Sequence, residues 1–351
     1  MKVTARDLHA FCVQALTKVG VGETDARTTA DVLVTTDTWG TFTHGTKALR
    51  AYVRRLRGGG LKKDGQPGVV AEGPAWALVD GDSSLGMVTS AFAMKTAITK
   101  ARTAGIACVG VRNNCHYGAA GYYASLAIPE NMIGVSMAND IPTVNAPGAK
   151  GPVLGSNPFA FAAPAGKARP IMLDMATSTV AGGKVFAAAQ LGKTIPGNWL
   201  LDANARPTTD PTPFSHAASL TPMGGYKGTG IALMIETLSA VLTGAAMTWQ
   251  VSSWTFSDPS KSTGHGAAFI AMNIEAFMPI AEFKERMDHL IQEIHASEKA
   301  EGAERIYVPG EIEFERREKA MVEGIELPDD VVSSLRSLGD ELGMDVNRIL
   351  N

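Results

Sequence analysis

The sequence predicts an α/β protein in which a body of strands and helices is joined by helical segments from both chain ends. Apolar residues follow helical spacing through the first sixty residues. Short apolar runs then alternate with helical stretches over 76–272, and helical spacing returns over 281–342. We therefore expect a helical part made of residues 1–74 and 312–351, and an α/β part over 75–311.

Three helices are expected before the body, over residues 4–19, 24–36 and 49–56. The first begins at a capping-box variant made by Thr4 and Asp7, and the third ends at a run of three glycines. The segment that leads from the second to the third, residues 37–45, carries too many hydroxyl groups and aromatic rings for a simple connector.

In the body, strands are expected over 76–80, 106–111, 133–138, 159–163, 171–173 and 267–272, and helices over 87–104, 122–128, 184–190 and 230–242. Three further helices are expected over 281–299, 313–323 and 328–342. The apolar stretch 230–247 is the best membrane candidate. Because Glu236 interrupts it, we interpret it as a buried helix.

Composition narrows the possible classes of protein. The 351 residues are 45% hydrophobic and 19% charged, which is typical of a globular protein and argues against disorder. A formal net charge of −3 without a basic stripe argues against nucleic-acid binding. The N-terminus lacks a signal-peptide core, and Cys12, Cys108 and Cys115 suit neither a zinc site nor a disulfide framework. We expect a soluble, cytoplasmic protein with no metal and no membrane partner.

Two histidines stand out once the common nucleotide and hydrolase motifs are found to be absent. The chain has no G-x-G-x-x-G after a strand, no P-loop, no G-x-S-x-G and no H-E-x-x-H. His44 and His116 each precede a glycine in a loop rich in hydroxyl or amide groups, whereas His9, His216, His289 and His295 have unremarkable surroundings. Proton exchange near neutral pH is one interpretation of the pair, and bonding to loop carbonyls is the other.

Three glycine-rich segments open helices in a way that suits an anion: 113–121, 174–184 and 224–230. Ordinary capping and turn chemistry is the alternative for each. Cys115 next to His116 raises the possibility of a thiolate nucleophile, but sequence neighbours rarely point together, which disfavours it.

Taken together and in order, these segments resemble the type-2 malate/L-lactate dehydrogenase family over nearly the whole chain. The matching segments are 37–45, 116–123, 155–158, 173–178, 222–228, 308–311 and 323–325. Their number and order are far more specific than any one of them. Spacing and detail look most similar to the ureidoglycolate dehydrogenase branch of the family.

The resemblance implies an NAD(P)-dependent oxidoreductase whose cofactor fold is not Rossmann. It implies a mixed, largely antiparallel sheet with flanking helices, a helical domain from both chain ends, and a homodimer with its active site near the subunit interface. The residues implied to bind NAD or NADP are Asn157, Asp174, Met175, Ala176, Ser178, Tyr226, Lys227, Pro309, Gly310 and Glu311.

The implied reaction moves a hydride between the nicotinamide and the carbon of a small 2-hydroxy or 2-oxo acid. His44 and His116 match the two histidines that carry the proton in different family members, and both stay candidates.

The chain departs from the family where the substrate carboxylate binds. Ala48 stands where arginine is usual, Thr43 where serine is usual and Trp39 where arginine is common. Thr43, Lys47 and Arg50 are the remaining candidates for substrate binding, and lysine cannot reproduce a bidentate arginine grip. We therefore expect an acid other than plain malate or lactate. Trp39 with Phe42 fits a bulkier substrate or, by preference, helix packing.

Two alternatives stay open. One is an NAD(P)H-dependent reductase of cyclic imino acids, piperideine- or pyrroline-2-carboxylate, in which the imine nitrogen takes the proton. The other is a dinucleotide-binding protein that has lost turnover together with the carboxylate-binding arginine, which the presence of both His44 and His116 disfavours.

Overall fold

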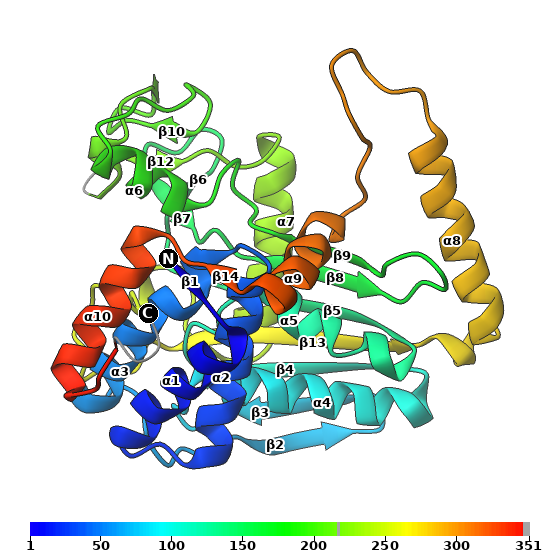
Figure 1. The fold of residues 1–351 in the computed structure, drawn as a ribbon, viewed down its shortest axis with the longest axis horizontal. Helices are drawn as coiled ribbons and strands as arrows, with labels where there is room; N and C mark the ends of the chain where they lie inside the picture. The colour runs from blue at the N-terminus through cyan, green and yellow to red at the C-terminus, as the bar shows by residue number, and fades with distance from the viewer. Residues whose placement is uncertain (216–217, 347–351) are drawn as a thin grey trace.

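A computed structural model describes residues 1–215 and 218–346, and within them the largest sheet has seven strands in the order β2-β3-β4-β13-β5-β8-β9 (Figure 1). The strands are Gly68–Gly73 (β2), Trp76–Asp80 (β3), Ile106–Asn114 (β4), Met132–Ala138 (β5), Phe159–Ala163 (β8), Ile171–Met175 (β9) and His265–Asn273 (β13). The β3–β4 pair is parallel and the other neighbours are antiparallel. The expected mixed, largely antiparallel and non-Rossmann sheet is confirmed. His216 lies outside the described residues.

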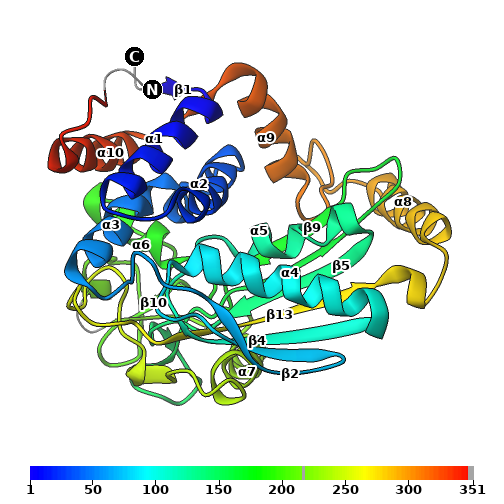
Figure 2. The ribbon, with the colours of Figure 1, turned by 90° about the horizontal axis from the view of Figure 1, so that it is seen from below.

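Helices cover both faces of this sheet. Gly86–Ala104 (α4) and Ala120–Ser125 (α5) pack on one face, and Tyr226–Glu236 (α7), continued by the π-helical turn Thr237–Val241 (η5), lies on the other (Figure 2). The central strand β13 is buried over most of its length, and its glycine and alanines allow helices to approach closely.

The two ends of the chain pack together. The N-terminal helices are Ala5–Lys18 (α1), Glu23–Thr38 (α2) and Leu49–Gly58 (α3), and the C-terminal ones are Glu311–Glu323 (α9) and Asp329–Leu342 (α10). The α10 helix contacts α1 and α3, and α2 contacts α9. Strand Lys2–Val3 (β1) pairs with Ile325–Glu326 (β14). Thr4 caps α1 by accepting a hydrogen bond from Asp7, as the sequence predicts. The domain boundaries at 74 and 311 stay a prediction.

Five short strands that the sequence does not predict form a small lobe. Its five-stranded sheet consists of Val144–Asn145 (β6), Pro152–Leu154 (β7), Leu200–Leu201 (β10), Pro207–Thr208 (β11) and Ser219–Leu220 (β12). Val185 of the adjacent helix Gly182–Gln190 (α6) packs with Leu200 and Leu220 in its own apolar core. Strands this short carry no alternation that a sequence can reveal, which explains why they were missed.

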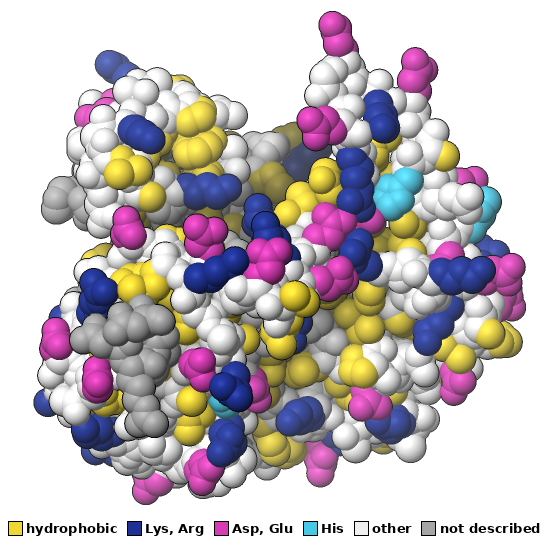
Figure 3. Space-filling view, in the orientation of Figure 1, with side chains coloured by type: hydrophobic (Ala, Val, Ile, Leu, Met, Phe, Trp, Pro, Cys, Tyr) yellow, Lys and Arg dark blue, Asp and Glu magenta, His cyan; other side chains and the backbone are white. Residues whose placement is uncertain are grey.

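The last long helix before the C-terminal pair, Ile280–Ala296 (α8), stands apart from the sheet (Figure 1). Asp288 anchors it, because its carboxylate accepts hydrogen bonds from the main-chain N–H groups of Gly166, Lys167 and Ala168. The surface is hollowed between α8 and the small lobe (Figure 3).

The apolar stretch 230–247 is not the buried helix that its hydropathy predicts. Glu236 is buried there, yet Leu233, Val241 and Leu242 are 57%, 56% and 68% exposed. The stretch covers the sheet with one side and leaves the other side uncovered in a single chain. No helix in residues 1–215 and 218–346 is long and apolar enough to cross a membrane.

Candidate active site

His44 and His116 are brought together from distant parts of the chain, with their ring centroids 5.5 Å apart. His44 ends the 3₁₀ turn Phe42–His44 (η1), which follows α2 and precedes the turn Thr46–Ala48 (η2). His116 lies in the loop that joins β4 to α5. The two predicted proton carriers therefore share one site, formed where the helical part meets the end of the large sheet.

Asp37 holds the turn that carries His44. Its buried carboxylate accepts hydrogen bonds from the main-chain N–H of Thr46, at 3.1 Å, and from the Thr46 hydroxyl. A Cβ atom at Gly45 would lie 1.8 Å from Asp37 Oδ1, so no larger residue fits there. Burial raises the pKa of Asp37 to about 7.

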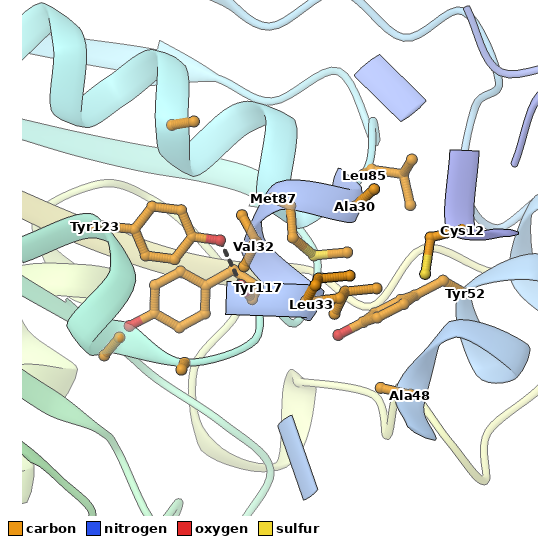
Figure 4. Close-up of a cluster of buried hydrophobic side chains, with 14 of the residues drawn as sticks. Cys12, Ala30, Val32, Leu33, Ala48, Tyr52, Leu85, Met87, Tyr117 and Tyr123 are labelled. Carbon is orange, nitrogen blue, oxygen red and sulfur yellow. Dashed lines mark hydrogen bonds between the residues drawn. The ribbon is translucent and has the colours of Figure 1, made fainter. Parts of the chain in front are cut away.

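Aromatic side chains hold His116. The Tyr52 hydroxyl oxygen lies 2.6 Å from His116 Nδ1, and the indole of Trp254 stacks on the imidazole at 4.1 Å and 13°. Arg55 in turn fixes the Trp254 loop, because its buried guanidinium donates to the carbonyl oxygens of Ser253, Trp254 and Lys261 at 2.5, 2.6 and 2.8 Å. Tyr52 projects from α3 beside Leu33 of α2 (Figure 4).

Burial lowers the pKa of both histidines, and it lowers that of His116 well below its usual value. For His116, the neighbouring His44 lowers the pKa further, whereas the carboxylate of Asp140 raises it in part. Asp140 also opposes the effect of burial on His44. Both rings are therefore neutral at pH 7, which is the form that accepts a proton.

Asp140 and His265 belong to this site although the sequence reasoning did not select them. Asp140 Oδ1 lies 3.2 Å from His265 Nε2, and His265 Nδ1 lies 2.9 Å from Thr263 Oγ1. His265 opposes Asn114 in the β13–β4 pairing, which places it next to the loop of His116. The sequence does carry a signal for Asp140 and His265. Each polar residue lies at the end of an apolar run, and the two runs form the neighbouring strands β5 and β13.

Of the three predicted substrate ligands, only Thr43 lies beside the histidines. Its hydroxyl oxygen is 2.9 Å from His44 Nδ1, and its methyl group lies against Gly183 at the start of α6. Lys47 and Arg50 instead form ion pairs with Asp330 and Glu341 of α10, at 2.6 and 2.5 Å. The structure directs both cations to α10, and their part in substrate binding stays a prediction that the structure does not support.

The burial of Trp39 and Cys115 favours structural over chemical roles for both side chains. Trp39 is 3% exposed within the main core, which agrees with the preferred interpretation as helix packing. Cys115 is buried as well, and burial raises the pKa of its thiol, which disfavours a thiolate nucleophile.

The segments predicted to bind the dinucleotide lie along β9 and its continuation. At one end, Met172 donates a main-chain hydrogen bond to Pro309, 3.0 Å long. In the middle, Asp174 accepts the N–H of Gly121, at 2.8 Å, which ties β9 to the start of α5 just after the His116 loop. At the far end, Ser178 forms a β-bridge with Pro222, close to the start of α7. The site histidines thus lie beside this line of segments.

Several predicted cofactor residues are engaged within the protein. Asn157 is fully buried and bonds to the Asp140 N–H, the Ala232 carbonyl and Glu236. Glu311 accepts from the Val308 N–H at 3.0 Å and pairs with His295 and Arg305. Burial raises the pKa of Asp174 to about 6. These side chains hold the segments in place, and the Ser178 hydroxyl likewise donates to the Val180 carbonyl.

Tyr226 and Lys227 are different, because both are exposed in the first turn of α7. Gly225 precedes them with φ at +66°, a conformation that favours glycine. A helix N-terminus with a neighbouring lysine suits a phosphate group. Together with the main chain of Met175, Ala176 and Gly310, these residues fit an elongated anionic ligand such as a dinucleotide.

Comparisons with known proteins agree with this geometry. The family model described as malate/L-lactate dehydrogenase matches residues 3–336. The malate dehydrogenase of Pyrococcus abyssi is 38% identical, over 98% of this chain and 96% of its own length. The L-sulfolactate dehydrogenase of Methanocaldococcus jannaschii is 40% identical, over 95% of this chain and 95% of its own length. The solved structure of the latter matches with a TM-score of 0.92 and covers 100% of both chains.

The expected likeness to ureidoglycolate dehydrogenases needs correction. The Escherichia coli ureidoglycolate dehydrogenase (NAD(+)) is 34% identical over 96% of this chain and 95% of its own. That is lower than the identity to the malate and sulfolactate dehydrogenases. Motif spacing and local detail therefore pointed to a branch that whole-chain identity does not favour.

Proposed function

This chain belongs to the malate/L-lactate dehydrogenase family, and we propose that it transfers a hydride between NAD or NADP and a small 2-hydroxy acid or its 2-oxo counterpart. One observation carries the proposal: the rings of His44 and His116, 5.5 Å apart, lie beside a line of segments that suits a dinucleotide. The nicotinamide supplies the hydride chemistry when bound, and the histidines handle the hydroxyl proton.

The proton step follows from the electrostatics of the site. A neutral imidazole near the substrate hydroxyl accepts its proton as the hydride departs, and returns it in the reverse reaction. The nearby carboxylate of Asp140 favours the protonated ring that results, because it raises the pKa of both histidines against the effect of burial. We assign the role to His116 or His44 and propose that Thr43 orients His44 through its hydroxyl.

For the cofactor, we propose that Tyr226 and Lys227 contact the phosphate groups, and that Met175, Ala176, Pro309 and Gly310 contribute main-chain contacts. Asn157, Asp174, Ser178 and Glu311 support these segments through the hydrogen bonds described above.

We propose the class of substrate from the relatives, and enzyme assays test it. Malate and sulfolactate are the first acids to test, because they name the relatives at 38–40% identity. The expectation of an acid other than plain malate or lactate stays a prediction, since Ala48 stands at the usual arginine position and Lys47 and Arg50 pair with α10. Steady-state rates with malate, lactate, sulfolactate and ureidoglycolate, each with NAD and NADP, test the class. If no acid is turned over while fluorescence still detects NADH binding, the proposed oxidoreductase activity is contradicted. The dinucleotide-binding protein without turnover is then favoured.

Reduction of cyclic imino acids is a second candidate, and Asp140 is the observation that favours it. A protonated imine is a cation, and the carboxylate of Asp140 near both histidines attracts one. The same assay with piperideine-2-carboxylate and NADPH or NADH distinguishes it. A kcat/KM for the imine above that for every 2-oxo acid would make reduction of imines the main activity.

We also propose that the chain forms a homodimer. The exposed apolar side chains of α7, of η5 and of the residue that follows η5, among them Leu233 and Leu242, form a face that solvent disfavours. Light scattering after gel filtration should give twice the chain mass of 36.9 kDa. Leu242→Asp should shift the mass toward the monomer if this face is the interface, whereas a wild-type monomer would refute the dimer itself.

A further inference from the structure

We infer that Tyr52 is a positioning residue for His116, which turns Nδ1 of the imidazole toward the protein and leaves Nε2 as the atom that exchanges the proton. The inference rests on the proposed function, in which His116 is one of the two proton carriers. Nothing in the motif pattern points to Tyr52, because it lies on the apolar stripe of α3 and has the spacing of a core residue.

The contact itself is short and buried. The Tyr52 oxygen is 2.6 Å from His116 Nδ1, and the tyrosine has no exposed surface. A buried hydroxyl group needs a hydrogen-bond partner, and among the described residues the partner of this hydroxyl is His116. Burial also raises the pKa of Tyr52 well above its ordinary value, so the hydroxyl stays protonated throughout the working pH range.

The ring of His116 is also fixed on its flat face. Trp254 stacks on both Tyr52 and His116, with centroid separations of 5.4 and 4.1 Å. Arg55 prevents this loop from retreating by binding three of its carbonyl groups. A stack restrains the tilt of an imidazole but not its rotation within the plane. The Tyr52 hydrogen bond supplies the remaining restraint, because it selects which nitrogen faces the protein.

The hydrogen bond also determines which nitrogen can act as a base. For Nε2 to accept the substrate proton, the neutral ring must carry its own proton on Nδ1. The Tyr52 oxygen is placed to accept a hydrogen bond from that Nδ1–H group. The main-chain N–H of Gly118 also points at Nδ1 and would favour the tautomer without a proton there, but at 3.5 Å it lies at the outer limit for a hydrogen bond and competes only weakly with the contact to Tyr52. The Tyr52 oxygen therefore also stabilises the imidazolium that forms when Nε2 takes up a second proton.

Tyr52→Phe tests the inference because it keeps the ring in the core and removes only the hydroxyl group. We expect kcat for oxidation to fall about 10-fold or more with little change in KM, and the acid limb of the kcat/KM profile to move to lower pH. Loss of the acceptor destabilises the imidazolium and thereby lowers its pKa. Tyr123→Phe is the matched control, since its buried hydroxyl donates to the Tyr117 carbonyl instead.

Different outcomes test the positioning role of Tyr52 and the proton-transfer role of His116. Suppose that both variants lower the melting temperature equally, but only Tyr52→Phe shifts the pH profile. The shift is then caused by loss of the contact between Tyr52 and His116, and the inference is supported. An unmoved acid limb in Tyr52→Phe, or one that moves to higher pH, overturns the inference. If His116→Ala retains full turnover, it is the proposed role of His116 that fails, whatever Tyr52→Phe does.

Discussion

The indole of Trp254 lies flat on the imidazole of His116, with 4.1 Å between ring centroids and 13° between planes. One face of the histidine is therefore closed to water. This desolvation is the main reason that the pKa of His116 falls well below its usual value. The site thus holds a base that stays unprotonated under conditions where a surface histidine would begin to charge.

The pH dependence of oxidation follows from this arrangement. Because burial lowers the pKa of His116 and of His44, kcat/KM for oxidation should stay level down to about pH 6.5, the ordinary histidine value, and decline only below it. The measurement is kcat/KM for the best 2-hydroxy acid between pH 5 and 8. An acid limb centred at or above 6.5 would show that the acting base is a solvated group.

Removal of either histidine should identify the proton carrier. His116→Ala or His44→Ala should lower kcat by about 10²–10⁴, which is the usual contribution of general acid–base catalysis. His289→Ala serves as the control, because that side chain is 71% exposed on α8. Rates from stopped-flow absorbance at 340 nm separate the two variants. Wild-type turnover in both would refute the proton transfer proposed here.

Lys47→Ala examines the predicted carboxylate ligand. The sequence alone predicts a raised KM, but the ammonium group is 2.6 Å from Asp330 in the structure. We therefore expect an unchanged KM and a loss of stability below about 1 kcal/mol, since the pair is partly exposed. Steady-state kinetics and urea unfolding measure the two quantities. A KM that rises several-fold would restore Lys47 to the substrate site.

Asp37→Asn should change how stability depends on pH. In the folded protein the pKa of Asp37 is raised to about 7, above the value near 3.8 of an unfolded chain. Its favourable contribution is complete below pH 3.8 and is lost as pH rises through 7. The free energy of unfolding of the wild type, relative to the variant, should therefore fall between about pH 4 and 7. Parallel curves for the two proteins would exclude the raised pKa.

Gly121 and Gly230 form a matched pair of glycines near the cofactor segments. A Cβ at Gly121 would lie 2.9 Å from Asp174 Oδ2, whereas one at Gly230 meets nothing within 4 Å. Gly121→Ala should cost about 1–3 kcal/mol and raise the Kd for NADH, because the tie between α5 and β9 must shift. Gly230→Ala, within α7, should be neutral or stabilising by about 0.5–1 kcal/mol. Thermal unfolding and NADH fluorescence titration give both values, and equal effects would contradict this contact.

The sequence predicts the long elements well because their cues are local. The apolar runs at 76–80 and 159–163 become strands with those same bounds, and the glycines after Leu56 end α3. The site was only partly predictable. His44 and His116 carry motif signals, but Tyr52 and His265 look like core residues until the fold places them against a histidine and a carboxylate. The ion pairs of Lys47 and Arg50 join residues almost three hundred positions apart, which no local pattern records.

The pairing of Val3 with Ile325 makes the two ends of the chain interdependent during synthesis. The turn that follows His44 rests on α10 through the Lys47–Asp330 ion pair and a hydrogen bond from Ser334 to the Lys47 carbonyl. A ribosome delivers α10 only after more than three hundred other residues have emerged. The N-terminal helices must therefore wait for their partners, and the turn that carries His44 gains its full support only when translation of the chain is almost finished.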